Sequence, residues 1–426
     1  MRPIFRLMNY NDAMKYEELS GKPILLLGKT KALNGDEFDT MLRLHRIGLV
    51  REYEEGVALV VEGRMMNPYE QAESARLYEA GVAPIVSIEG LEEWLCRSIE
   101  PNRLLMSLKL SRDQQRLVDF LKNPYITDEL FYKLLRLYDW QNEGLFDNDR
   151  NRDVTASIIG RFYTDLARNH NVQYAMSGLA HLIERYGTAE LIGAVAELSP
   201  IAKELRESRD RSLGGILDAM ALHPATPEAV LRLLIHERFP LLARREPLSL
   251  EEELLNLGNV DEELAQNPTL SAAGATRLME RHPFLIARHF PLNREIFEAL
   301  WEEHASALAS NPSLTAQMQE MLMQRGGEDV CTALAANSAT KGEFLRQLSQ
   351  SGRYGRFLAS NEALSSVELE GLYHTADPAI LEALAANPST PIELLYQLSL
   401  DRRFERRVKT NPAFGKHIQT HNIGWH

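Results

Sequence analysis

Apolar residues recur along most of the chain in short groups that polar junctions separate. In the stretch from 384 to 398, LAANPSTPIELLYQL, apolar positions recur every third residue after the junction, which predicts a helix with one apolar face. These positions are Ile392, Leu395 and Leu398. Asn387 precedes a proline and is predicted to end the preceding helix, because such a position disfavours the α conformation. Thr390 is predicted to cap the next helix, with Glu393 completing a capping box.

The same junction recurs at intervals of 21 to 26 residues. Its anchor residues are His223, Glu246, Asn267, Phe290, Asn311, Asn337, Asn361, Asn387 and Asn411. Proline follows seven of these nine anchors, and the residue three positions before each anchor is apolar, so the pattern is structural. Helix caps are predicted at Thr226, Ser249, Ser271, Asn293, Thr315, Thr340, Ser365 and Thr390. Each unit has room for one ordinary helix and one shorter helical piece, and it must stack on its neighbours to bury its apolar face.

The repeated phrase LAxNPxTPxELLxxL resembles the leucine-rich repeat variant family. The resemblance implies a right-handed α-solenoid in which an α-helix alternates with a short 3₁₀ helix. Degenerate copies at Asn123, with Thr127 as a cap, and at Asn169 extend the array over about residues 112–420, or about eleven or twelve repeats. The polar segment 141–153 within it is predicted to be an exposed loop and a mobile hinge.

The N-terminal region has a different pattern, in which short apolar runs alternate with amphipathic helices. Strands are predicted at 23–28, 56–63 and 83–88, as a small parallel sheet flanked by helices. The first helix of this region is predicted to end at Gly48 as a C-cap, and the second at Gly81. An extended lead-in and a short helix, Asn11 to Leu19, are predicted before the first strand.

This order resembles the BRCT domain over about residues 22–100. The shared features are a first strand ending in glycine, LLLG, then strands of the LVV and IVS types, and a last helix that carries Trp94. The resemblance implies protein contacts. Phosphopeptide-binding members use a Ser or Thr and its neighbours after the first strand, where Lys29 and Thr30 are the candidates here, together with a lysine on the second helix. That helix has no lysine in this chain, which favours packing and protein contact over phosphate recognition.

Composition limits the classes of function. The net charge of −13 argues against broad attraction to nucleic acid or anionic membranes. The two cysteines, Cys96 and Cys331, are too few for a metal cluster or a disulfide framework and fit a reducing compartment. No signal peptide, membrane span or catalytic motif is recognisable, so we expect a cytoplasmic protein without enzymatic activity, cofactor or metal.

Arginines lie near the junctions of successive repeats, and stacking would align them. The candidates for binding phosphates or an acidic partner are Arg238, Arg244, Arg245, Arg281 and Arg288. The alternative is that helix C-termini attract these cations, and glutamates are interleaved with them. We favour this alternative.

The sequence thus predicts a multidomain protein, with a small α/β module followed by an all-α solenoid. The expected boundaries are a lead-in at 1–21, the BRCT-like module at 22–100, degenerate helical repeats at 101–222, and regular repeats with a basic C-terminal cap at 223–426. The predicted function is a non-enzymatic scaffold that binds protein partners. The alternative is a DNA-associated protein of repair or replication that holds phosphates with its arginines. The oligomeric state stays open.

Overall fold

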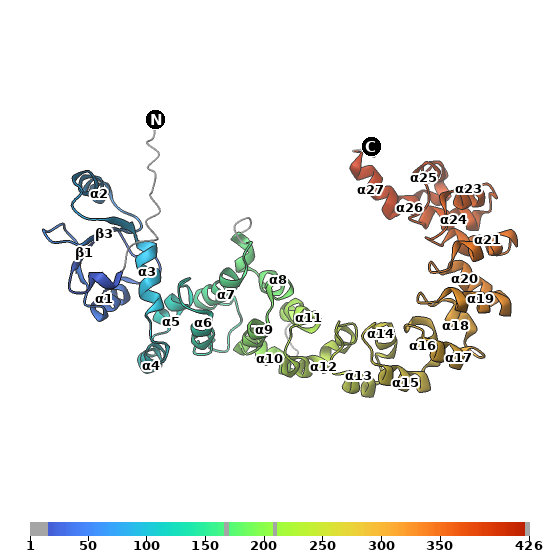
Figure 1. Cartoon of the computed structure of the whole chain (residues 1–426), viewed down its shortest axis with the longest axis horizontal. Coiled ribbons are helices and arrows are strands. Elements are labelled where there is room, and N and C mark those ends of the chain that lie inside the picture. Colours follow the sequence, from blue (N-terminus) through green and yellow to red (C-terminus); the bar gives the residue numbers. More distant parts are fainter. Residues whose placement is uncertain (1–15, 166–169, 208–210, 422–426) are drawn as a thin grey trace. The chain divides into compact units, whose positions relative to one another are not determined.

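A computed structural model describes residues 16–165, 170–207 and 211–421 (Figure 1). The chain forms two compact units, one up to Glu237 and one from Arg238 onward. A four-stranded parallel sheet with its helices comes first, and the rest of the described chain is helical. This order confirms the predicted succession of a small α/β region and a helical region. Of the predicted helix from Asn11 to Leu19, the described part is a 3₁₀ helix, η1 (Tyr16–Leu19), and residues 11–15 lie outside the described range.

The sheet has the strand order β2-β1-β3-β4 with all neighbours parallel. Its strands are β1 (Pro23–Leu27), β2 (Gly48–Val50), β3 (Leu59–Glu62) and β4 (Ile85–Ser87). The two central strands are almost wholly buried apolar residues, as a sheet covered on both faces requires. Three of the strands lie within the predicted ranges, whereas β2 was not predicted.

Helices α1 (Gly35–Leu44), α2 (Pro68–Ala80) and α3 (Ile88–Arg97) connect and follow these strands. Gly81 ends α2 in the left-handed conformation, as predicted. The prediction for Gly48 was wrong, because α1 ends at Leu44 and Gly48 is the first residue of β2. The chain instead turns through Arg46, which takes the left-handed conformation with a φ of 60°.

The helices of the first unit continue up to a break in α12. They are α4 (Pro101–Ser111), α5 (Gln114–Leu121), α6 (Asp128–Leu135), α7 (Asp149–Phe162), α8 (Met176–Tyr186), α9 (Ala189–Ala196), α10 (Ser199–Glu207), α11 (Gly214–Leu222) and the first part of α12 (Glu228–Ala243), with the 3₁₀ helices η3 (His170–Tyr174) and η4 (Arg211–Leu213). Thr127 caps α6 as predicted. Asn169, the anchor of the other predicted copy, lies outside the described residues.

The polar segment 141–153 forms neither helix nor strand up to Asn148, and its residues there are mostly exposed or half-buried, as its composition suggested. Its last five residues are the first turns of α7, and Leu145 is 0% exposed. The Thr155 hydroxyl donates to the carbonyl of Leu145 at 2.9 Å, and the Asn151 side chain donates to the carbonyl of Gly144 at 2.9 Å. The buried Leu145 and these hydrogen bonds hold the segment against α7.

Helix α5 joins the α/β module to the helices that follow it within the first unit. The Arg116 guanidinium pairs with Glu37 of α1 and donates to Ser107 Oγ of α4 at 2.8 Å. The Asn123 side chain donates to the Cys96 sulfur of α3 at 3.2 Å. The module and the first helical copies therefore belong to one compact unit.

In the second unit the helices form two interleaved series (Figure 1). One series, here called the even row, contains α14 (Asp261–Gln266), α16 (Pro283–His289), α18 (Ala305–Ala309), α20 (Glu328–Ala336), α22 (Gly355–Ala359), α24 (Pro378–Ala386) and α26 (Arg402–Lys409). The odd row contains α13 (Glu251–Leu257), α15 (Ala272–Arg281), α17 (Arg294–Leu300), α19 (Ala316–Arg325), α21 (Gly342–Gln350), α23 (Ser366–Tyr373), α25 (Ile392–Ser399) and α27 (Pro412–Thr420). Each even-row helix contacts the next helix of its row. The helices of both rows are α-helices, where the family resemblance implied alternation with short 3₁₀ helices.

The predicted caps divide into two groups. Ser271, Asn293, Thr315 and Ser365 cap their helices as predicted. Thr390 does not, because α25 begins after Pro391 and no capping box with Glu393 forms. Its hydroxyl donates back to the carbonyl of Leu384 at 2.7 Å.

The other three predicted caps do not cap a helix either, because their hydroxyl groups form hydrogen bonds elsewhere. Thr226 and Thr340 donate to the carbonyls of Met220 and Leu334, at 2.6 and 2.7 Å. Ser249 accepts a hydrogen bond from Arg245 at 2.9 Å. The failing threonines stand three residues after their anchors, at a buried position that leucine fills in other repeats: Leu270, Leu314 and Leu364.

Candidate interaction surface

The anchor asparagines of the second unit join each repeat to the one before it. The Asn387 side chain donates to the carbonyls of Ala359 and Asn361, at 2.8 and 3.1 Å. Its Oδ1 accepts the amide of Ser389 at 2.8 Å. Five further asparagines make the same three kinds of bond: Asn267, Asn311, Asn337, Asn361 and Asn411. All six are buried, so this asparagine ladder is part of the interior.

Arg245, and not the predicted Glu246, occupies the anchor position before Asn267, because its carbonyl accepts the hydrogen bond that a preceding anchor accepts elsewhere in the ladder. Asn267 donates to the carbonyls of Ala243 and Arg245, both at 2.8 Å. The Arg245 side chain is 2% exposed and donates to the carbonyl of Pro247 at 2.6 Å. Burial lowers the pKa of its guanidinium. Arg245 therefore holds the fold and cannot belong to a surface stripe of arginines.

The other predicted arginines do not form one free cationic surface. Arg244 pairs with Glu263 at 3.1 Å, and Arg281 pairs with Asp261 at 3.2 Å. Arg238 is half-buried at the break in α12, where its φ and ψ are −121° and 19°. Arg288 is exposed on α16. Acids of α14 thus pair with two of the five candidates.

The exterior of the even row differs from its interior in how far the side chains vary. Three residues before each anchor the side chain is apolar and nearly fully buried: Leu264, Ala287, Leu308, Leu334, Leu358, Leu384 and Val408. Five residues before each anchor the side chain is exposed or half-buried and changes in kind: Glu262, Leu285, Ser306, Thr332, Arg356, Glu382 and Arg406. The stacking is therefore constant, while the exposed chemistry differs from one repeat to the next.

Lys29 and Thr30 follow β1 as predicted, but a carboxylate lies next to them. Lys29 is exposed and Thr30 is half-buried. The amide of Gly28, just before them, donates to Glu70 Oε1 of α2 at 3.0 Å. Hydrogen bonds from the amides of Asn67 and Gly28 lower the pKa of Glu70. A phosphate brought to Gly28 would therefore meet a negative charge where the family resemblance implied a lysine.

The next amides along this connection bind a second carboxylate. Glu92 of α3 is 0% exposed and accepts hydrogen bonds from the amides of Lys31, Ala32 and Leu33, each at 3.0 Å from Oε1. Sequence reasoning missed Glu92, because the residue stands among other acids in EGLEEWL and nothing in the letters distinguishes it. The donors of this connection are thus used within the protein.

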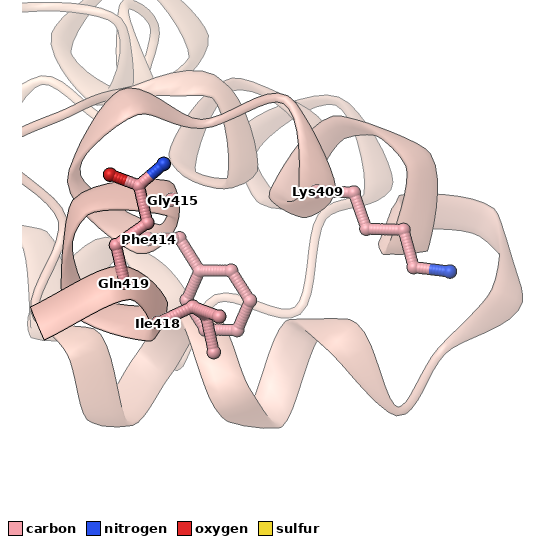
Figure 2. Close-up of a pocket in the computed structure, with 5 residues that line it drawn as sticks. All are labelled: Lys409, Phe414, Gly415, Ile418 and Gln419. Atoms are coloured by element: carbon pink, nitrogen blue, oxygen red, sulfur yellow. The ribbon is translucent and has the colours of Figure 1, made fainter. Parts of the chain in front are cut away.

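A hollow lies at α27 and is lined by Lys409, Phe414, Gly415, Ile418 and Gln419 (Figure 2). Its wall is mainly apolar. In Figure 2 the Lys409 side chain extends away from Phe414 and Ile418. Ligand sites combine apolar walls with a few polar groups that point to one place. The side chains that line this hollow do not converge in that way, so we do not regard it as a ligand site.

Within residues 16–165, 170–207 and 211–421, no group of three or more His, Cys, Asp or Glu side chains could hold a metal ion. No helix in the same described ranges is long and apolar enough to cross a membrane. A comparison with known protein families found no match, and none was found among curated proteins or solved structures. The candidate surface is the exterior of the even row, whose exposed side chains differ from one repeat to the next.

Proposed function

We propose that this chain is a non-enzymatic scaffold for protein partners, built from an α-solenoid of the leucine-rich repeat variant type and a BRCT-like module. The asparagine ladder supports the solenoid part of the proposal, because each anchor bonds to the repeat immediately before it. Stacks of this kind offer long, continuous surfaces on which successive repeats contribute side chains.

The observation that carries the proposal is the contrast between the two positions of the even row. The buried position, three residues before each anchor, is apolar in every repeat of the row, because stacking requires an apolar side chain there. The exposed position includes an acid at Glu262, a hydroxyl at Ser306 and a base at Arg356. Side chains that stacking leaves unconstrained and that differ between repeats suit recognition of a specific partner along the row.

The BRCT-like module supports a second protein contact in the same proposal. Glu70 and Glu92 occupy the backbone donors around Lys29 and Thr30, which disfavours a phosphate there. Contact with a partner through side chains does not need those donors. DNA association, the alternative function, gains no support from Arg244, Arg245 and Arg281, whose charges are used within the fold.

The test is capture of partners from the cells that make this protein, with and without nuclease. The tagged wild type is compared with Glu262→Lys/Arg356→Glu, which leaves the net charge unchanged, and with an odd-row control, Glu295→Lys/Arg346→Glu. We expect nuclease-resistant protein partners whose recovery falls several-fold with the even-row variant and holds with the control. Loss of every partner on nuclease treatment would refute the scaffold and favour nucleic acid.

A further inference from the structure

Helix α26 carries the densest group of cations in the second unit. Its sequence RRFERRVK turns Phe404 and Val408 inward and leaves five basic side chains exposed. These side chains are Arg402, Arg403, Arg406, Arg407 and Lys409. The whole chain has a net charge of −13, so such a cationic helix is a local departure from the surrounding charge.

Three of the five cations already have carboxylate partners. Arg403 pairs with Asp401 at 2.7 Å, Arg407 with Glu382 of α24 at 3.4 Å, and Lys409 with Glu405 at 2.7 Å. Arg402 and Arg406 have no ion-pair partner among the described residues, and we call these two the cationic strip. They stand four residues apart, where like charges on a helix repel each other. Arg406 lies in the last turn of α26, where the helix dipole favours a cation, whereas Arg402 is the first helical residue, where the dipole opposes one. The charge of Arg402 also helps to lower the pKa of Glu405.

We propose that the cationic strip binds an acidic segment of a protein partner, one that presents two carboxylates about one helical turn apart. A guanidinium holds a carboxylate through two parallel hydrogen bonds, and two adjacent guanidinium groups can hold two carboxylates in register. The proposal rests on the scaffold function proposed above and assigns a partner chemistry to one helix of the even row.

The surroundings of the strip favour a short acidic segment over nucleic acid. Carboxylates of Glu382, Asp401 and Glu405 lie beside it, each bound to a neighbouring cation. A nucleic acid carries phosphates along its whole length and needs many contiguous cations to hold them. A short peptide needs only the strip, and it can leave the flanking ion pairs intact.

The probe is a fluorescein-labelled helical peptide of about 12 residues with glutamates at i and i+4. A second peptide has glutamine at both positions, and a short DNA duplex is titrated in parallel. Fluorescence anisotropy at low salt should show binding of the glutamate peptide only. Arg402→Glu/Arg406→Glu should weaken that binding about tenfold or more, and Arg402→Lys/Arg406→Lys should weaken it less, because lysine keeps the charge but not the paired geometry.

The control variant is Arg294→Glu/Arg346→Glu, which makes the same change in net charge on odd-row helices. Circular dichroism of each full-length variant establishes that it is folded. An equal loss in both glutamate variants would mean attraction by net charge alone and would overturn the inference, as would tighter binding of the duplex or no binding of the glutamate peptide. One of these negative results could be found together with nuclease-resistant partners whose capture depends on Glu262 and Arg356. In that case the scaffold function would be supported, and only the acidic partner of α26 would be refuted.

Discussion

At the scale of the residue, asparagine is suited to the anchor because one short side chain both donates and accepts. Asn387 gives two hydrogen bonds to carbonyls of the preceding repeat and receives one from its own repeat. Aspartate of the same shape has no donor, and alanine has neither group. His223 provides the accepting part of this function, since its Nδ1 accepts the amide of Ala225 at 3.2 Å.

Replacement of Asn387 by alanine should strongly destabilise the protein. It leaves the buried carbonyl of Ala359 and the amide of Ser389 without this partner, and the carbonyl of Asn361 keeps only the amide of Leu364. We expect a loss of about 2–4 kcal/mol in the free energy of unfolding, because unsatisfied buried groups cost more than the bond itself contributes. Urea unfolding followed by circular dichroism measures it. Asn259→Ala, at an exposed position, should change the free energy by less than about 0.5 kcal/mol, and an equal effect of both variants would count against the ladder.

The two cysteines should differ in reactivity. Burial raises the pKa of the Cys96 thiol to about 11, whereas Cys331 is half-exposed. A thiol reacts as its thiolate, so alkylation of Cys96 should stay slow until the pH approaches about 11, or until the protein unfolds. The raised pKa also means that this group contributes stability below its ordinary pKa of about 9 and loses it as the pH rises through about 11.

Iodoacetamide labelling with peptide mapping between pH 7 and pH 11 separates the two sites. Cys331 should be labelled first throughout the native range. Faster labelling of Cys96 at neutral pH would mean that α3 and Asn123 do not hold that thiol in the interior.

At the scale of the element, the sequence predicted well wherever an apolar period is long, and poorly where one contact decides the boundary. The spacing of the junctions predicted where the helices of the two rows lie, because each repeat must bury an apolar residue equivalent to Leu384 three positions before its anchor. The caps at Thr340 and Thr390 failed because a threonine hydroxyl can serve a helix start or a carbonyl six residues back, and local sequence does not distinguish the two. Strand β2 is only three residues long and has no period of its own.

Glu92 shows how one side chain of α3 fixes the connection after β1. Its carboxylate accepts three consecutive amides, which is an anion-binding arrangement filled by the protein itself. Such a role depends on the packing of α3 against this connection. No local pattern marks it, so it could be found only from the structure.

Glu92→Gln should therefore destabilise the first unit by about 2–3 kcal/mol, because an amide nitrogen would face backbone donors and the charge would be lost. The neighbouring Glu93 is the matched control, since its carboxylate forms a surface ion pair with Arg97 at 2.6 Å. Glu93→Gln should cost less than about 1 kcal/mol. Hydrogen exchange at Lys31, Ala32 and Leu33 gives a local measurement, and unchanged protection in Glu92→Gln would contradict this role.

At the scale of the whole molecule, the predicted domain boundaries and the compact units do not coincide. The sequence placed the regular repeats from residue 223, where the junction phrase becomes recognisable, whereas the second unit begins at Arg238. The reason lies within α12, where Arg238 departs from helical geometry and Pro240 follows within two residues. The α/β module, predicted as a separate domain, is held to the first helices by Arg116 and Asn123.

The ladder also determines how the second unit should respond to truncation. Its hydrogen bonds run within one repeat or between adjacent repeats, so removal of α26 and α27, residues 401–426, should leave the remaining helices folded. The circular dichroism signal per residue should be retained, with a lower urea midpoint and lower solubility because the apolar face of α24 becomes exposed. A loss of helical signal far beyond the residues removed would mean that the unit folds as one cooperative whole, and nearest-neighbour stacking would then be the wrong description of it.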